Sequence, residues 1–79
     1  MILTFTFPND DHDIKPDCGN ARIEGSIIGI VNKHGAHITV NLCHGNYRTI
    51  VVSCTSHEME QALVLETTVL PKRVMRFAH

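Results

Sequence analysis

Histidines and cysteines are the residues of this chain best suited to metal chemistry. Two close pairs stand out: His34 and His37 in "HGAH", and Cys54 and His57 in "CTSH". Structural zinc takes four nitrogen or sulfur ligands, commonly from two such pairs. A metal site made of these four residues is one interpretation. We favour the other, in which the histidines are surface residues and the cysteine lies in the core, because free cysteine packs as a small apolar residue.

Cys54 and His57 also raise the question of a nucleophile and its base. A spacing of three residues at a strand end does not by itself bring a thiol and an imidazole into contact. The sequence offers no evident third group to orient the histidine. We therefore predict that the protein is not an enzyme.

The charged residues are segregated along the chain. Acids crowd the early stretch "NDDHD", whereas cations gather near the end in "KRVMR". The acidic stretch lacks the central glycine and the distal glutamate of a calcium loop, so we interpret it as a solvated loop. Six of these residues form a candidate interaction patch for a protein partner: Asp10, Asp11, Asp13, Lys72, Arg73 and Arg76.

Length and composition predict one globular domain spanning residues 1–79. The chain is 43% hydrophobic and 19% charged, with a net charge of −1. This charge provides no field for nucleic acid, so we expect no such partner. Three cysteines, with neither a signal sequence nor a membrane-length apolar run, predict a cytoplasmic protein with free thiols and no membrane contact. A core this small needs reinforcement, so we also expect self-association.

The elements that must position these residues have mostly strand-like patterns. "ILTFTF" alternates apolar residues with threonine, which predicts a strand within residues 1–7, followed by an acidic loop at 8–22 and a barrel-like core at 23–79. "RIEGSIIGIVN" is rich in β-branched residues. Its Gly25 and Gly29 suggest a strand bent at a barrel corner. The "NKHG" that overlaps its end fits a type I turn.

Residues 37–54 are typical of a β-hairpin, whose register depends on the length of its loop. A two-residue loop would pair Val40 with Val51, whereas a three-residue loop pairs Val40 with Ile50. Only the longer loop keeps the apolar residues of both strands on one face. The pattern therefore predicts the longer loop, with Val40 and Leu42 facing the core and Tyr47, Thr49 and Val51 facing outward.

The stretch after the hairpin changes to a helical period. Thr55, with Glu58 three residues later, is typical of a capping box, and Met59, Ala62 and Leu63 would share one face of a short helix. "TTVLP" and "RVMRF" are typical of two final short strands. The predicted fold is mainly all-β: a small closed or partly closed barrel of about six short strands with one short helix.

The order of these features over about three quarters of the chain resembles the small TOBE barrels of molbindins and of transporter ATPases. "RIEGSIIGIVNKHGAHITVNL" is similar to the opening strands of that family, and "GNYRTIVVSCTSHEMEQALVL" to its next strand and short helix. "TTVLPKRVMRF" resembles the closing strand with its lysine. The resemblance implies a barrel that binds molybdate or a similar oxyanion through backbone amides, hydroxyls near Thr55 and Ser56, and Lys72.

Two functions are therefore expected. The first is a non-enzymatic module that binds an oxyanion such as molybdate through Thr55, Ser56 and Lys72. The second is a small regulator or inhibitor that docks on a larger protein partner and takes no small-molecule ligand. The second is motivated by the segregated charges and by the lack of a complete catalytic set.

Overall fold

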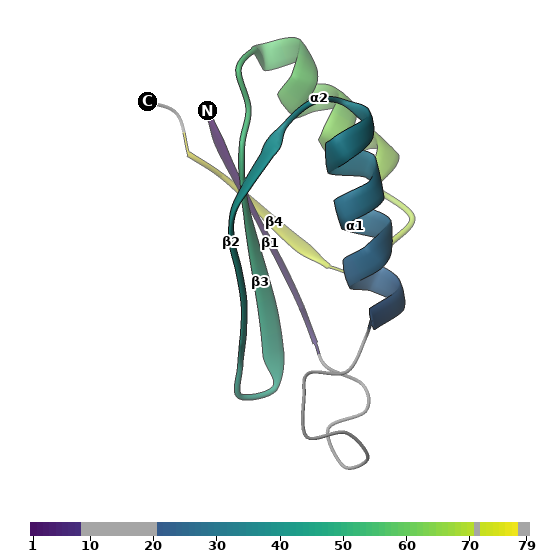
Figure 1. Ribbon diagram of the computed structural model, residues 1–79, viewed down its shortest axis with the longest axis vertical. Coiled ribbons are helices and arrows are strands. Elements are labelled where there is room, and N and C mark those ends of the chain that lie inside the picture. Colours follow the sequence, from purple (N-terminus) through teal and green to yellow (C-terminus); the bar gives the residue numbers. More distant parts are fainter. Residues whose placement is uncertain (9–20, 71, 78–79) are drawn as a thin grey trace.

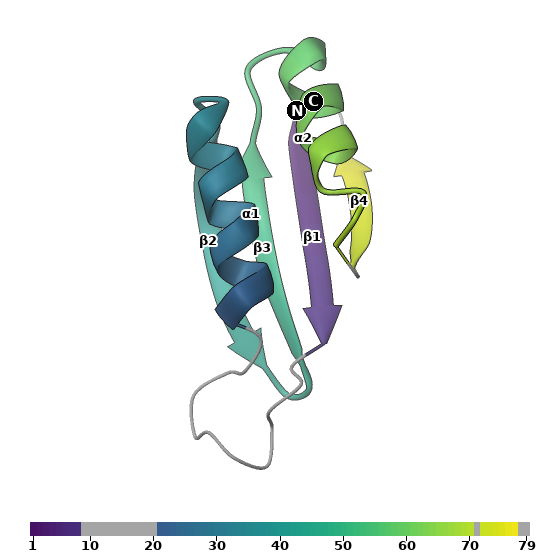
Figure 2. The same cartoon turned by 90° about the vertical axis from the view of Figure 1, so that its right-hand side faces the viewer.

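The computed structural model describes residues 1–8, 21–70 and 72–77. These ranges form β1 (Ile2–Pro8), α1 (Ala21–Lys33), β2 (His37–His44), β3 (Tyr47–Ser53), α2 (His57–Glu66) and β4 (Arg73–Phe77). The strands make one sheet in the order β2-β3-β1-β4, with every neighbouring pair antiparallel. Both helices lie on the same face of the sheet, and none of the described elements covers the other face (Figure 1, Figure 2). This β-α-β-β-α-β order defines a ferredoxin-like, split β-α-β architecture.

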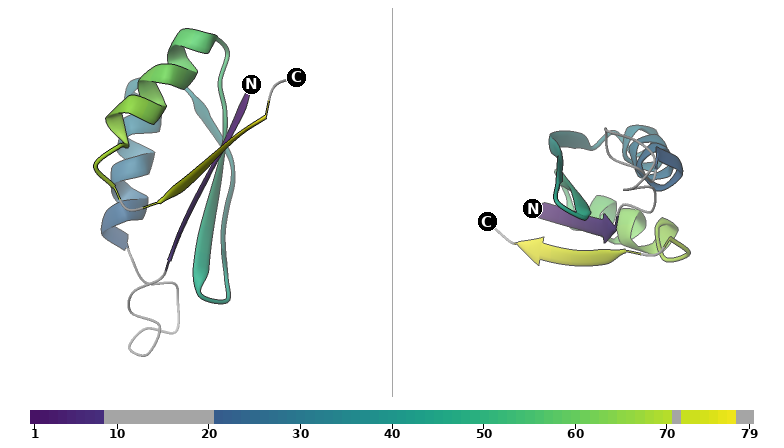
Figure 3. Two further views of the ribbon diagram at one scale, coloured as in Figure 1. Left: turned by 180° about the vertical axis from the view of Figure 1, so that it is seen from behind. Right: turned by 90° about the horizontal axis from the view of Figure 1, so that it is seen from below.

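The strand-rich character of the prediction is confirmed, but the predicted barrel is wrong because the sheet is not closed. β2 and β4 are its two edges and do not pair with each other. The described ranges hold four strands and not about six, because residues 22–32 belong to α1 and residues 67–70 form a turn after α2. From below, both helices lie to one side of the strands (Figure 3).

α1 occupies the segment that was predicted as a strand, and the spacing of its apolar residues explains why. Ile23, Ile27 and Val31 recur every four residues and are all buried, as on one face of a helix. Gly25 and Gly29 are exposed, and a Cβ atom built on either would have no neighbour within 4 Å. Burial of the apolar face therefore outweighs the low helix propensity of β-branched residues and glycine.

α1 ends at a turn that requires a glycine. Gly35 has a φ of 75°. Its N–H donates to the carbonyl of Asn32 at 3.2 Å, and the N–H of Ala36 donates to the carbonyl of Val31 at 3.1 Å. This pair of bonds is a Schellman cap, which places a left-handed residue just after a helix. "NKHG" is therefore a helix end and not the predicted type I turn between strands.

β1 forms as predicted and provides the centre of the core. Leu3, Phe5 and Phe7 are completely buried, whereas Thr4 and Thr6, between them, are only half-buried. Full burial of one such apolar side chain contributes about 1.5–3 kcal/mol. β1 also lies between β3 and β4 in the sheet, so its three buried side chains anchor the centre of the fold.

The hairpin has the shorter loop that its apolar pattern disfavours. The two loop residues are Gly45 and Asn46, and Gly45 has a φ of 58°, which favours glycine. Val40 consequently pairs with Val51. The predicted three-residue loop is therefore wrong.

A β-bulge in β2 reconciles the short loop with a buried core. The register shifts between Ile38 and Val40. Thr39 is the extra residue there, and its hydroxyl donates to the carbonyl of Val51 at 3.2 Å. One extra residue reverses the faces of the strand beyond it. Ile38 is thus on the face covered by the helices, whereas Val40 and Leu42 face away from them, contrary to the prediction.

α2 forms in the predicted place but is capped one residue later. The N-cap is Ser56 and not Thr55, and its hydroxyl accepts a hydrogen bond from the N–H of Met59 at 3.1 Å. Leu63 is buried, and Met59 is half-buried against the core, as the periodicity predicts. Thr67 ends the helix, with its hydroxyl donating to the carbonyl of Leu63 at 2.8 Å.

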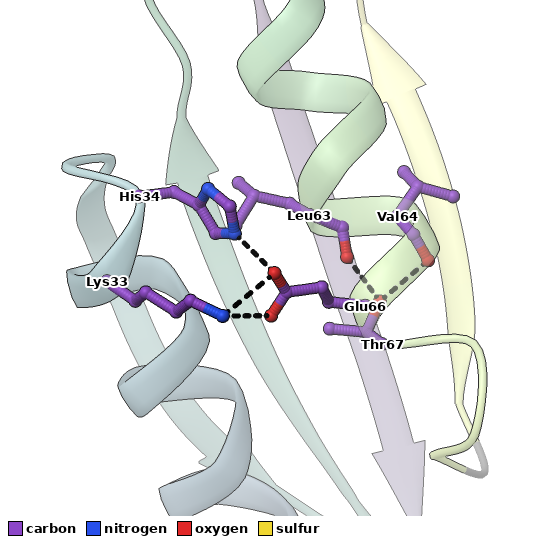
Figure 4. Close-up of polar contacts among 6 residues, drawn as sticks. All are labelled: Lys33, His34, Leu63, Val64, Glu66 and Thr67. Atoms are coloured by element: carbon purple, nitrogen blue, oxygen red, sulfur yellow. Dashed lines mark hydrogen bonds and ion pairs between the residues drawn. The ribbon is translucent and has the colours of Figure 1, made fainter.

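A polar cluster ties the ends of the two helices together (Figure 4). The carboxylate of Glu66 accepts from Lys33 Nζ at 3.1 Å and lies 2.8 Å from His34 Nε2. Hydrogen bonds from His34 and then from Lys33 lower the pKa of Glu66. The cluster therefore links the end of α1 to the end of α2. Neither of these helices is long and apolar enough to cross a membrane.

The cysteines differ in state. Cys54 is buried and has a free thiol, as expected. Cys43, on β2, is disulfide-bonded, so the expectation of free thiols is wrong for this residue. Cys18 lies outside the described residues.

Candidate interaction surface

The three residues predicted to hold an oxyanion lie at opposite ends of α2. Thr55 and Ser56 precede the helix, and Ser56 serves as its N-cap. Lys72 lies beyond the other end, where its Nζ donates to the carbonyl of Thr67 and burial lowers its pKa. A helix of 10 residues is about 15 Å long. The structure therefore does not bring Lys72 together with the two hydroxyls.

The four residues considered for a metal are dispersed as well. His34 contacts Glu66 beyond the end of α1, His37 begins the edge strand β2, and His57 begins α2. Cys54 is buried in the core. Within residues 1–8, 21–70 and 72–77, no three His, Cys, Asp or Glu side chains are grouped as metal ligands.

The surroundings of Cys54 do not favour nucleophilic chemistry. Burial, and then the carboxylate of Glu60, raise the pKa of its thiol, while the amino terminus acts in the opposite direction. A nucleophilic cysteine needs a lowered pKa instead. His57 is exposed, and its Nδ1 lies 3.4 Å from the Glu60 carboxylate. The thiol of Cys54 is therefore a packing group of the core.

The acidic half of the predicted interaction patch lies outside the described residues: Asp10, Asp11 and Asp13. The three cations of the other half do not form one patch. Lys72 is engaged at the end of α2. Arg76 pairs with Leu3, whose side chain is on the face covered by the helices, whereas Arg73 pairs with Thr6 on the opposite face. Only Arg73 is thus available on the uncovered side of the sheet.

The uncovered side of the sheet gathers most of the exposed large apolar side chains. We call it the open face, and the register places on it Ile2, Thr4, Thr6, His37, Val40, Leu42, Tyr47, Thr49, Val51, Ser53, Arg73 and Met75. Six large hydrophobic side chains of the described residues are exposed, and four of these are on the open face: Val40, Leu42, Tyr47 and Met75, with 44–56% of their surface exposed. The other two are Leu65 on α2 and Val69 in the turn after it.

The polar groups of the open face are mainly uncharged. Thr4, Thr6 and Thr49 contribute hydroxyl groups beside the apolar side chains. Among the described residues, Arg73 is the only Lys, Arg, Asp or Glu on this face. Interface centres are depleted of charge and enriched in aromatic residues, Met and Arg, and the open face has Tyr47 and Met75. The open face therefore shares the low charge and the Tyr and Met content of interface centres.

An open hollow lies beside β4 at the margin of this face. It is lined by Thr6, Arg73, Val74 and Met75. A guanidinium with a hydroxyl nearby supplies donors for a carboxylate, and arginine binds this group with two parallel hydrogen bonds. The hollow is thus suited to an acidic side chain set at the edge of an apolar contact.

The sequence predicted only part of the open face. The outward positions of Thr4, Thr6 and Thr49 follow from the alternation of β1 and β3 and are confirmed. The outward positions of Val40 and Leu42 were missed. The signal that could have found them is the Gly45-Asn46 dipeptide, because glycine at the first position suits a two-residue hairpin loop.

Comparison with models of known protein families found none that matches this chain, and comparison with curated proteins found no match. The resemblance to TOBE barrels therefore stays a prediction. The ferredoxin-like architecture hosts many functions and does not identify one by itself. The open face, with its exposed apolar side chains, is the surface from which a function can be inferred.

Proposed function

We propose that this protein is an interaction module that docks on a larger protein partner through the open face of its sheet. The supporting observation is the gathering of Val40, Leu42, Tyr47 and Met75 on one face. Monomeric soluble proteins rarely expose a large contiguous apolar patch unless it binds something. We do not propose the oxyanion function, because Thr55 and Ser56 lie at one end of α2 and Lys72 lies beyond the other.

The open face also defines the chemistry of the partner. Its exposed apolar side chains lie on the two edge strands and at the hairpin end, where Tyr47 supplies a large side chain with a polar tip. Its margin presents the cation of Arg73 in a hollow. The complementary partner therefore presents apolar side chains beside an Asp or Glu that reaches Arg73.

Site-specific photo-cross-linking in cells tests this proposal. A benzophenone amino acid is placed at Leu42 or Met75 on the open face, and at Leu65 or Val69 as matched controls that are also apolar and are more exposed. We expect one protein partner to be captured from both open-face positions and from neither control. Capture of the same partner from Leu65 or Val69, or of none from the open face, would contradict the proposal.

A pair of charge reversals tests the acidic contact. Arg73→Glu places repulsion against the partner's carboxylate, so we expect the cross-link from Leu42 to fall about tenfold or more, because like charges brought together at an interface cost several kcal/mol. Arg76→Glu changes the same charge in the same strand but on the other side of the sheet. Arg76→Glu should leave the cross-link yield from Leu42 unchanged. If both variants lowered this yield equally, Arg73 would not be the residue that contacts the partner's carboxylate.

A further inference from the structure

The two edges of the sheet are protected to different degrees. β4 is 5 residues long and carries Arg73 and Arg76. β2 is 8 residues long, and its sequence "HITVNLCH" contains no Asp, Glu, Lys, Arg or Pro. Natural proteins guard exposed edges with short strands, charges and proline, because an unguarded edge pairs with another strand. Of these devices β2 has none, and its bulge at Thr39 leaves the rest of the strand regular.

The hairpin loop determines which backbone groups β2 presents to a neighbour. The residues that flank a two-residue loop form a hydrogen-bonded pair, here His44 with Tyr47. Such pairs alternate with non-hydrogen-bonded pairs along an antiparallel ladder. Asn41, paired with Ile50, is three positions further and belongs to the non-hydrogen-bonded kind. Its N–H and C=O therefore point away from β3, toward the edge of β2 with which no other described strand pairs.

We propose that two copies of this chain join edge to edge, β2 against β2 and antiparallel, about a twofold axis at Asn41. At this axis Asn41 lies opposite Asn41 of the second copy, and the two residues exchange both backbone hydrogen bonds. Val40 then lies opposite Leu42 of the second copy. Residues that face each other in an antiparallel pair share a face, so the two open faces become one surface.

The size of the open face favours this arrangement. Four strands spaced about 4.8 Å apart and about 20 Å long cover about 400 Å² in projection. A standard protein interface buries about 800 Å² of accessible surface on each partner, and a wider face provides more of it. Two faces joined through β2 double the projected area. The inference thus rests on the proposed function and adds that the docking surface is built from two chains.

The side chain of Asn41 forms hydrogen bonds on the helix side of the sheet. Its Nδ2 donates to Glu24 Oε2 at 2.8 Å, and its Oδ1 accepts from Arg48 Nη1 at 2.7 Å. These contacts hold the middle of β2 against α1 and β3, so the edge is fixed before a second copy arrives. They also provide the control for a test, because the side chain and the backbone N–H of Asn41 can be removed separately.

Sedimentation equilibrium of the full chain tests the pairing. We expect a mass of twice 8.8 kDa for the wild type at micromolar concentration. Asn41→Ala removes the side-chain contacts and should remain a dimer, whereas Asn41→Pro also removes the outward N–H and should be a monomer with an unchanged circular dichroism spectrum. A monomeric wild type, a dimeric Asn41→Pro or a monomeric Asn41→Ala would each overturn the inference.

If Asn41→Pro does not fold, hydrogen exchange of the Asn41 amide in the wild type tests the pairing instead. Protection that rises with protein concentration supports the pairing, and protection independent of concentration rejects it. The failure of this inference is distinct from the failure of the proposed function. A monomer that still captures a larger partner from Met75 rejects the pairing and keeps the open face as a docking surface.

Discussion

The three cations near the end of the chain show how one position in the register decides the role of a side chain. Lys72 and Arg73 are adjacent in sequence, yet Lys72 donates to the end of α2 while Arg73 lies on the open face. Arg76 is on the face covered by the helices. In sequence these residues form one basic cluster. In the structure only Arg73 is placed to meet a partner on the open face.

The Glu66 cluster makes the stability of the protein depend on pH. Because the pKa of Glu66 is lowered on folding, its carboxylate stabilises the protein above the unfolded value near 4.5, and this contribution is lost as the pH falls through the lower folded value. We expect Glu66→Gln to be less stable than the wild type at neutral pH, with a difference that shrinks in acid. Urea unfolding across this range measures the effect.

Arg22→Gln is the control for this measurement. Arg22 is exposed in the first turn of α1 and takes no part in the contacts of the Glu66 cluster. Its stability difference from the wild type should therefore stay nearly constant with pH. A difference for Glu66→Gln that is equally constant would show that the ionised carboxylate does not tie the two helices together.

At the scale of elements, α1 depends on burial and not on local preference. Its apolar face is made of Ile23, Ile27 and Val31, and its exposed side includes Gly25 and Gly29. β-branched residues and glycine both disfavour a helix in isolation. The helix exists because it covers the buried side chains of the sheet, so its exposed glycines are sites where stability can be gained.

Gly25→Ala and Gly29→Ala should each stabilise the protein by about 0.5–1 kcal/mol, as alanine does in the middle of a helix. Apart from the adjacent residues and the backbone of the helix itself, no atom of the described residues lies within 4 Å of the added Cβ at either position. Gly35→Ala is the matched control: its surroundings are equally empty, but its φ of 75° is unfavourable for alanine, so it should destabilise the protein. Urea unfolding of the three variants measures the changes. A loss of stability at Gly25 and Gly29 would contradict the helical assignment.

The elements that the sequence predicted well are those with a purely local signal. The alternation of β1 and the cap and apolar face of α2 are contained in short stretches. α1 was missed because its β-branched residues and glycines gave a strand-like composition that masked the four-residue spacing. The hairpin register was missed because one extra residue, Thr39, reverses the faces of β2, and a bulge leaves no clear mark in sequence.

The residues of the open face could be predicted only where the strands that carry them were predicted correctly. Tyr47, Thr49 and Val51 were expected to face outward and do so, because β3 is regular. Val40 and Leu42 were predicted to face the core. Because the prediction placed them on the wrong face, the apolar patch on the open face could not be predicted. The oxyanion set stays a prediction, and its residues are dispersed for a different reason: residues that would be near in an assumed barrel lie at opposite ends of a helix.

At the scale of the whole molecule, the fold is one-sided. The helices cover one face of the sheet (Figure 2) and bury the core there. Apolar side chains on the other face are exposed. The proposed function and the proposed pairing both follow from this asymmetry, the first from the open face and the second from the β2 edge.

The most direct test of the open face is the affinity of the captured partner for Leu42→Lys compared with Leu65→Lys. Both residues are exposed, so both variants should keep their stability within about 0.5 kcal/mol. We predict that Leu42→Lys weakens binding about tenfold or more, as expected for a charge buried in an interface centre, and that Leu65→Lys binds like the wild type. Normal binding by Leu42→Lys, with loss in Leu65→Lys, would place the docking surface on the helices and contradict the account.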